Sequence, residues 1–200
     1  MLNDVTIIML TDSNTKKLGM PKVFYQFKGK PLWSVQYDKF IDLCSNIIIV
    51  GLDIDSRPTR VESLLLALKQ VKTDKVLIVD LDLPLLSSSL IEKILNLKDY
   101  DSVTAVTYFE ENIFDSKNKG YLNSVNLMRI HPIQLFTTRL LLDCLLNYKG
   151  SSDLKEFTNL IFDNTNIIPI FVESNEKETI KLNSKEDAFL INNILNISRH

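Results

Sequence analysis

Short continuous runs of apolar residues alternate along the chain with longer segments whose apolar residues recur every three or four positions. The runs at residues 5–11, 46–52 and 75–79 are continuous, which is typical of strands buried on both faces of a sheet. Residues 32–43 and 61–71 show helical spacing instead. Strands that alternate with helices in this way predict βαβ units and a mostly parallel sheet.

The second half of the chain continues this alternation with one interruption. Further strands are expected at residues 101–109, 167–172 and 179–182, and further helices at 87–97, 137–148, 153–162 and after a cap at Ser184 and Asp187. Residues 110–126 are polar and break the pattern, which predicts an arm-like insertion. We therefore expect a single α/β domain over residues 1–200, a three-layer α/β/α sandwich with a mostly parallel mixed sheet.

Composition narrows the class of protein. The chain has 200 residues, of which 45% are hydrophobic and 24% charged, as in ordinary globular domains. A net charge of -2 argues against non-specific binding to nucleic acid. No apolar run approaches the ~18 residues that span a bilayer, and no basic leader begins the chain. We expect a cytoplasmic protein with no membrane contact, in which Cys44 and Cys144 are buried thiols.

Two carboxylates stand directly after the third apolar run, in the sequence Val76-Leu-Ile-Val-Asp80-Leu-Asp82-Leu-Pro84. In open α/β sheets, ligands bind outside the carboxyl ends of the strands. Residues two apart on a strand point to the same side, so Asp80 and Asp82 can face one site. A divalent metal with bound phosphates would neutralise them there. The alternative is that one carboxylate ends the strand and the other caps a turn or helix.

A polar, basic loop follows the first expected strand. It carries Lys17 and Lys22, which are point charges suited to an oligophosphate. A loop after a strand can also present backbone N–H groups to phosphates. Taken alone, such a loop is more often a solvated lysine cluster. The chain has only five glycines, where average usage would give around fourteen, and phosphate loops usually need them.

The order of these motifs resembles nucleotidyltransferases that transfer a nucleoside monophosphate to a sugar or polyol phosphate. The family most similar is the methylerythritol phosphate cytidylyltransferases, with their ribitol phosphate relatives. The resemblance covers nearly the whole chain and rests on Pro21-Lys22, Gly29-Lys30-Pro31, Arg60 and Ser63, Asp80, a turn at Gln134-Leu-Phe136, Ser152-Asp153, and the closing Ile180-Lys181, Ser184 and Glu186-Asp187. It implies a Rossmann-like nucleotidyltransferase fold.

The resemblance also implies an activity and a site. The activity is transfer of a cytidylyl group from CTP to a small phosphorylated polyol, with diphosphate released, as in isoprenoid biosynthesis. The implied roles are stabilisation of the α-phosphate by Lys17 and Lys22, orientation of the acceptor by Lys181, binding of Mg²⁺ by Asp80 with Asp82, and nucleotide contacts from Leu10, Thr11, Asp12, Ser13, Arg60 and Ser63. The arm at residues 110–126 would complete the acceptor site of a neighbour in a homodimer.

Two alternatives remain open at this point. The family's first loop is alanine-alanine-glycine-x-glycine, whereas this chain has Thr11-Asp-Ser-Asn-Thr15. Side chains then stand where a backbone approaches phosphate closely, which favours a retained fold without catalysis that acts as a binding or regulatory partner. Asp82-Leu-Pro84 also resembles the Asp-x-Pro metal site of the molybdenum-cofactor and phospholactate guanylyltransferases, so a guanylyltransferase is the other alternative.

Overall fold

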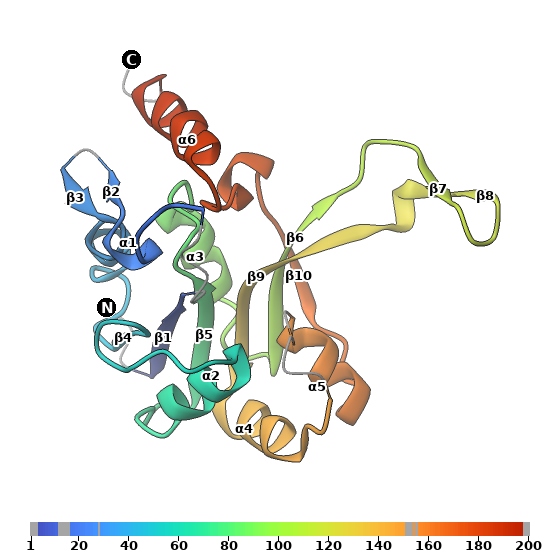
Figure 1. Cartoon of the computed structure of the whole chain (residues 1–200). Coiled ribbons are helices and arrows are strands. Elements are labelled where there is room, and N and C mark those ends of the chain that lie inside the picture. The colour runs from blue at the N-terminus through green and yellow to red at the C-terminus, as the bar shows by residue number, and fades with distance from the viewer. Residues whose placement is uncertain (1–3, 12–16, 28, 151–153, 155, 198–200) are drawn as a thin grey trace.

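The computed structural model describes residues 4–11, 17–27, 29–150, 154 and 156–197. The described part of the chain contains a six-stranded sheet with the order β10-β6-β9-β5-β1-β4 (Figure 1). Its strands are β1 (Val5–Leu10), β4 (Ile47–Ile49), β5 (Lys75–Asp80), β6 (Ser102–Tyr108), β9 (Met128–Thr137) and β10 (Ile170–Glu173). All neighbours are parallel except β9, which runs antiparallel to both β5 and β6.

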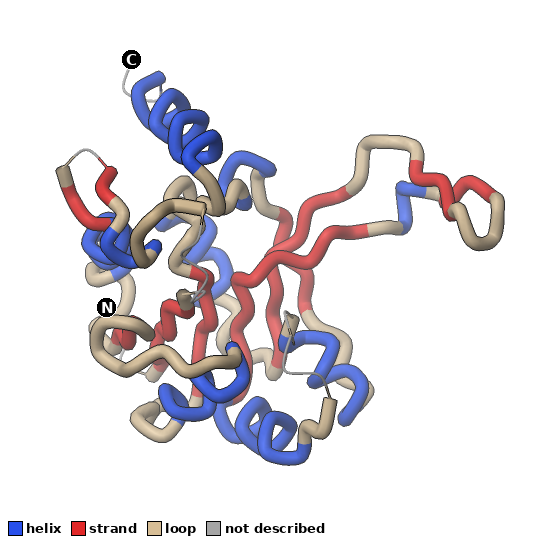
Figure 2. Tube along the Cα trace, in the orientation of Figure 1, coloured by secondary structure: helices blue, strands red, loops and turns tan. Residues whose placement is uncertain are grey.

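Helices cover both faces of this sheet (Figure 2). They are α1 (Leu32–Phe40), α2 (Arg60–Leu68), α3 (Ser88–Leu95), α4 (Thr138–Asn147), α5 (Phe157–Thr165) and α6 (Lys185–Ile197). Buried side chains of α1, α3 and α6 form one core cluster, and those of α2, α4 and α5 form the other. In β1, Ile7 and Met9 belong to the first cluster and Ile8 and Leu10 to the second, because successive residues of a strand point to opposite faces. The predicted three-layer α/β fold is confirmed.

Strand β9 corrects the prediction of a turn at residues 134–136. The sequence contains Pro132, which lacks a donor for the hydrogen-bond ladder and is uncommon in central strands. The structure accommodates it because pairing with β5 ends at Ile133, and the register between β6 and β9 shifts between Thr104 and Val106. A bulge of this kind lets a proline remain within a long strand.

The segment before α6 also differs from the prediction. A strand was expected at residues 179–182, but Thr179 ends a 3-10 helix, η3 (Glu176–Thr179). The chain then passes the end of the sheet and makes one backbone contact there, in which Leu182 N donates to Asp82 O at 2.8 Å. The predicted cap of α6 is confirmed, since Ser184 Oγ accepts from Asp187 N and Asp187 Oδ2 accepts from Ser184 N.

Residues 110–126 leave the sheet between β6 and β9 and project from the body of the protein (Figure 1). They contain the hairpin β7 (Ile113–Asp115) and β8 (Gly120–Leu122) and the 3-10 helix η2 (Ser124–Asn126). β7 and β8 form a two-stranded sheet of their own. We call residues 110–126 the arm. Among the described residues, no helix has both the length and the apolar character needed to cross a membrane.

Candidate active site

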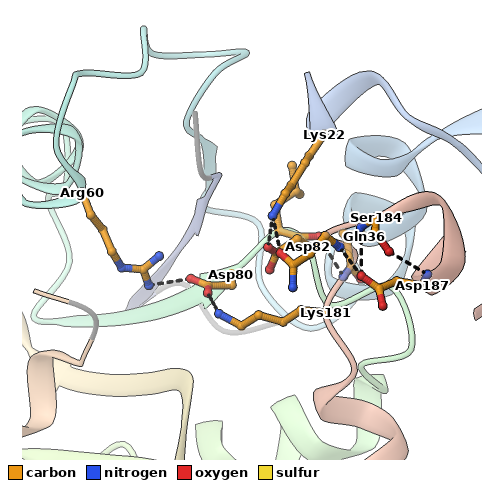
Figure 3. Close-up of polar contacts among 10 residues, drawn as sticks. Lys22, Gln36, Arg60, Asp80, Asp82, Lys181, Ser184 and Asp187 are labelled. Carbon is orange, nitrogen blue, oxygen red and sulfur yellow. Dashed lines mark hydrogen bonds and ion pairs between the residues drawn. The ribbon is translucent and has the colours of Figure 1, made fainter. Parts of the chain in front are cut away.

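The carboxyl end of β5 carries a network of buried ion pairs (Figure 3). Asp80, the last residue of β5, is 5% exposed and lies opposite Leu10 of β1 in the parallel register. Its Oδ1 is 2.5 Å from a terminal nitrogen of Arg60, and its Oδ2 accepts from Lys181 Nζ at 2.6 Å. Arg60 begins α2, and its guanidinium also lies 5.3 Å from the ring centre of Phe157.

Asp82 forms the second half of this network. Its Oδ2 accepts from Lys22 Nζ at 2.7 Å, and Lys22 also donates to Asn183 Oδ1 at 2.8 Å. Lys22 is only 3% exposed and is the first residue of the 3-10 helix η1 (Lys22–Phe24). Three cations from three distant segments therefore meet two carboxylates at the end of one strand. We call Lys22, Arg60, Asp80, Asp82 and Lys181 the ion-pair cluster.

Burial and charge shift the ionisation of the groups around this cluster. Burial, and next the negative charge of Asp80, raise the pKa of Asp82. Burial disfavours the charged form of Lys181, but the carboxylates of Asp80 and Asp82 outweigh it and raise the pKa of Lys181 above its usual value. Glu156 is a further acidic neighbour, since burial and then the charge of Asp80 raise its pKa to about 7. At neutral pH, Lys181 is therefore charged and Glu156 is partly neutral.

The carboxylates fit a metal ion that arrives with a nucleotide. Asp82 Oδ1 is buried and has no hydrogen-bond partner among the described residues, so one acceptor in the cluster is unused there. Within the described ranges, no group of three or more His, Cys, Asp or Glu side chains could hold a metal on its own. Mg²⁺ needs no such cage, since it is commonly bound by one or two carboxylates together with substrate phosphates and water. The donor set of Asp80 and Asp82 is therefore compatible with Mg²⁺.

Other residues predicted for the site lie apart from the cluster. Lys17 is exposed and forms no ion pair with any described residue. The hydroxyl of Ser63 is buried and accepts from the backbone N–H of Arg57 at 2.8 Å. Thr11 directly follows β1, and its Cγ2 methyl lies against Gly51. Asp12 and Ser13 lie outside the described residues, as do Ser152 and Asp153.

The structure adds Glu156 and Asn183, which the motifs did not indicate, and gives contacts for Gln134, which they did. Glu156 Oε2 accepts from Gln134 Nε2 at 3.0 Å, and Gln134 Oε1 accepts from Phe157 N at 3.1 Å. Gln134 therefore ties β9 to the start of α5, where Glu156 faces the charges of Asp80, Arg60 and Lys181. Asn183 is the second partner of Lys22. In the sequence, Glu156 is simply a polar residue before a helix, and Asn183 a polar residue shortly after Lys181. Their contacts join segments far apart in sequence, so no local pattern indicates them.

Comparison of the sequence with known protein families gives one family for this chain. The family described as the MobA-like NTP transferase domain matches residues 13–165 of the chain. The chain belongs to this family. Its matched region includes the basic loop, the start of α2 and both carboxylates at the end of β5. The nucleotidyltransferase relationship suggested by the motifs is therefore confirmed.

Individual relatives agree with the family assignment. A bifunctional enzyme IspD/IspF from Nitratiruptor is 24% identical, and the alignment covers 96% of this chain and 54% of that protein. Among solved structures, 4-diphosphocytidyl-2C-methyl-D-erythritol synthase from Anaerococcus prevotii has a TM-score of 0.75 at 18% identity, over 97% of this chain and 99% of that one.

A second solved structure gives the same result. The 2-C-methyl-D-erythritol 4-phosphate cytidylyltransferase from Thermus thermophilus has a TM-score of 0.76 at 16% identity, over 96% and 98% of the two chains. At these identities the two structures establish a shared fold. The chain spans about half the length of the bifunctional relative that it matches.

Proposed function

We propose that this chain transfers a cytidylyl group from CTP to a sugar phosphate or polyol phosphate of the methylerythritol or ribitol type. A phosphate oxygen of the acceptor forms a bond to the α-phosphorus of CTP. The bond from that phosphorus to the bridging oxygen breaks, and diphosphate leaves with the electron pair. The observation that carries this proposal is the ion-pair cluster, whose three cations are held by two carboxylates at the ligand-binding end of β5. The names of the relatives support CTP as the donor.

Lys22 is the residue best placed to stabilise the transition state. Its ammonium is buried and held between Asp82 and Asn183, so a positive charge already lies at the end of β5 when negative charge grows on the α-phosphate. To act, Lys22 exchanges the Asp82 carboxylate for a phosphate oxygen. Lys17, at the exposed edge of the basic loop, supplies a second charge to the outer phosphates. No protein nucleophile takes part, and catalysis consists of positioning and electrostatic stabilisation.

Lys181 holds the acceptor. Its side chain is 37% exposed, whereas that of Lys22 is 3% exposed, so a second substrate can reach Lys181 while the nucleotide occupies the interior. An ammonium that is charged over the whole physiological pH range is suited to a phosphate dianion. Arg60, Ser63 and the end of β1 at Leu10 and Thr11 flank the nucleoside, and the expected base contacts of Asp12 and Ser13 belong to the same loop.

Asp80 and Asp82 would hold Mg²⁺ in the substrate complex. Bound there with the triphosphate, the ion supplies charge neutralisation and a template for the phosphate oxygens. Asp80 ends the strand and bridges Arg60 and Lys181, so its two oxygens set the spacing between the nucleoside side and the acceptor side. Asp82 has the unused oxygen of the pair.

The arm is proposed as the contact of a homodimer. It exposes a set of apolar side chains that the rest of the described chain does not cover, namely Phe114, Tyr121, Leu122 and Val125. A two-fold arrangement would bury the same patch on both subunits. We also propose that the protein works in the cytoplasm, without nucleic-acid or membrane partners.

A transfer assay tests this function. The purified full chain is incubated with each of CTP, GTP, ATP and UTP, with methylerythritol phosphate or ribitol phosphate as acceptor, and diphosphate release is followed with and without Mg²⁺. We expect release with CTP alone and only with Mg²⁺. Release with GTP in its place supports the guanylyltransferase alternative. No release with any triphosphate supports the alternative of a fold that acts as a binding partner.

A variant of the acceptor lysine tests the assignment of sides within the site. Lys181→Met should raise the KM for the acceptor about tenfold or more while the KM for CTP changes little, because it removes a phosphate contact of one substrate. Lys185→Met, an exposed lysine at the start of α6, is the matched control and should behave as wild type. Equal losses for both substrates would contradict the assignment of Lys181 to the acceptor.

A further inference from the structure

Two polar side chains of α1 reach the loop that follows β5. Gln36 Nε2 donates to the carbonyls of Leu83, at 2.5 Å, and Leu81, at 3.4 Å. One turn later, Lys39 Nζ donates to the carbonyls of Pro84, at 2.6 Å, and Leu86, at 2.9 Å. Residues three apart on a helix lie on the same face. We call Gln36 and Lys39 the carbonyl clamp; Figure 3 shows Gln36 beside Asp82.

Burial of the two polar side chains of the carbonyl clamp is energetically unfavourable if they only fill space. Gln36 is fully buried, and in the part of the chain that the structure describes its Oε1 has no hydrogen-bond partner, although buried polar atoms are nearly always paired. Burial lowers the pKa of Lys39 to about 8, and the nearby charge of Glu178 only partly opposes this shift. An apolar side chain would fill either position without these costs. Their presence indicates that the four carbonyls, rather than the helix, need the donors.

The four clamped carbonyls lie in the chain segment directly after Asp80, the segment that also contains Asp82. Leu81 stands between Asp80 and Asp82, and its carbonyl belongs to the peptide unit that joins Leu81 to Asp82. The preceding peptide unit is held from the other side, because Leu81 N donates to Leu10 O at 2.7 Å. The carbonyl of Asp82 accepts from Leu182 N at 2.8 Å, next to Lys181. The loop is thus bonded on one side to α1 and on the other to the segment that carries the acceptor lysine.

A second connection runs through the end of the same loop. Ser87 follows Leu86, caps α3 and donates through its hydroxyl to Glu178 Oε1. Glu178 lies in η3, three residues before Lys181, and its charge also acts on Lys39. The carbonyl clamp therefore contacts the loop after β5 directly. It is connected to the segment that carries Lys181 through the Ser87–Glu178 hydrogen bond.

We propose that Gln36 and Lys39 are positioning residues for the nucleotidyl transfer, which fix Asp80, Asp82 and Lys181 relative to one another through the backbone of residues 81–87. The proposal rests on the function proposed above. Binding of CTP depends mainly on charge neutralisation, which tolerates small displacements. The transfer step depends on in-line alignment of two substrates, where a misplacement of about 1 Å can cost about 10²-fold in rate.

Steady-state kinetics of clamp variants test this proposal. Gln36→Met and Lys39→Met keep side-chain length but remove the donors, and Lys39→Arg keeps a cationic donor. We expect each Met variant to lower kcat about tenfold or more with the KM for CTP changed less than about threefold. Lys39→Arg should recover most of the rate. Gln70→Met and Lys93→Met, which alter exposed residues, are the matched controls and should leave kcat unchanged.

Amide hydrogen exchange on the same proteins reports the clamp itself. Exchange at Leu81, Leu86 and Leu182, whose N–H groups bond to or within this region, should be faster in the Met variants at a pH and temperature where their melting curves match wild type. Wild-type kcat in both Met variants overturns the proposal, and so does a kcat loss that Lys39→Arg shares in full. If Lys39→Met does not fold, Gln36→Met and Lys39→Arg decide. A wild-type chain without transfer overturns the proposed function, which is a different result from active clamp variants.

Discussion

The ion-pair cluster at the end of β5 and the arm differ in what supports them. Lys22, Arg60 and Lys181 come from distant parts of the sequence, and Asp80 and Asp82 between them are each 5% exposed. The arm is supported almost entirely by itself. Among the described strands β7 pairs with β8 alone, and Tyr121 is 79% exposed although its ring packs on Phe114. The comparison teaches that one chain by itself holds the charges of the ion-pair cluster in place, whereas the arm has little packing beyond its own hairpin among the described residues. This is why we propose that a partner subunit covers the arm.

The largest effect is expected at the buried lysine of the cluster. Lys22→Ala should lower kcat about 10²–10³-fold with a smaller change in the KM for CTP, because it removes a preorganised charge that acts on the transition state. Steady-state kinetics on full-length protein measure this, with Lys72→Ala, an exposed lysine, as the control. Unchanged turnover in Lys22→Ala would show that the cluster is structural, and would end the distinction between the two regions.

The next effect concerns the carboxylate at the end of β5. Asp80→Asn keeps the shape of the side chain but removes its charge, so it should abolish the Mg²⁺-dependent part of CTP binding while Mg²⁺-independent binding persists. Calorimetry with and without Mg²⁺ measures this. If Asp80→Asn retains the metal dependence and Asp82→Asn loses it, the metal belongs on Asp82. A large loss of stability with normal binding would make Asp80 a structural residue.

A smaller effect is expected at the arm. Tyr121→Asp places a charge in the exposed apolar patch, and it should weaken dimerisation about 30-fold or more if this ring is a main contact. Sedimentation or light scattering over a range of concentrations measures the change. Tyr100→Asp alters a tyrosine that is 50% exposed elsewhere and is the matched control. A wild-type chain that stays monomeric at high micromolar concentration would show that the arm is a solvated hairpin.

The smallest effect is a pH dependence at the border of the cluster. The pKa of Glu156 is raised to about 7 in the folded protein, first by burial and then by Asp80, while the unfolded chain titrates near its ordinary value. The folded state therefore binds the extra proton, and the contribution of Glu156 to stability is present at low pH and lost as the pH rises from about 4.5 to about 7. Glu156→Gln should remove this loss.

Urea unfolding at pH 5 and pH 8 measures the effect of Glu156. We expect Glu156→Gln to gain about 1–2 kcal/mol relative to wild type between the two pH values. Glu173→Gln, at the exposed end of β10, is the control and should show no such gain. An equal pH dependence in wild type and Glu156→Gln would mean that Glu156 is ionised like an exposed carboxylate.

Sequence patterns predicted the frame of the site for a physical reason. Continuous apolar runs identified β1 and β5, and ligands bind outside the carboxyl ends of the strands in open α/β sheets, so Asp80 and Asp82 were expected at a binding site. The family resemblance then pointed to Lys22, Arg60 and Lys181. The structure brings these side chains into one cluster, and their catalytic roles stay predictions.

The remaining features depend on contacts that a local pattern does not contain. The resemblance predicted a turn at residues 134–136, whereas these residues pair within β9, a strand that contains Pro132 at the irregularity in its register with β6. Residues 179–182 alternate like a strand, yet they have only one backbone partner at the sheet edge. The Lys22–Asp82 pair and the approach of Glu156 to Asp80 join segments far apart in sequence. Gln36 lies in a predicted helix, and the helical pattern does not indicate its hydrogen bonds to the carbonyls of Leu81 and Leu83.

The most direct test of the central claim, that the end of β5 holds a nucleotide with Mg²⁺, is titration calorimetry of the full chain with CTP, with Mg²⁺ and then with excess chelator. The account predicts saturable binding of one CTP per chain with Mg²⁺, much weaker binding after chelation, and weaker binding of GTP, ATP and UTP. Absence of binding heat with every triphosphate, in protein whose melting curve shows that it is folded, would contradict it.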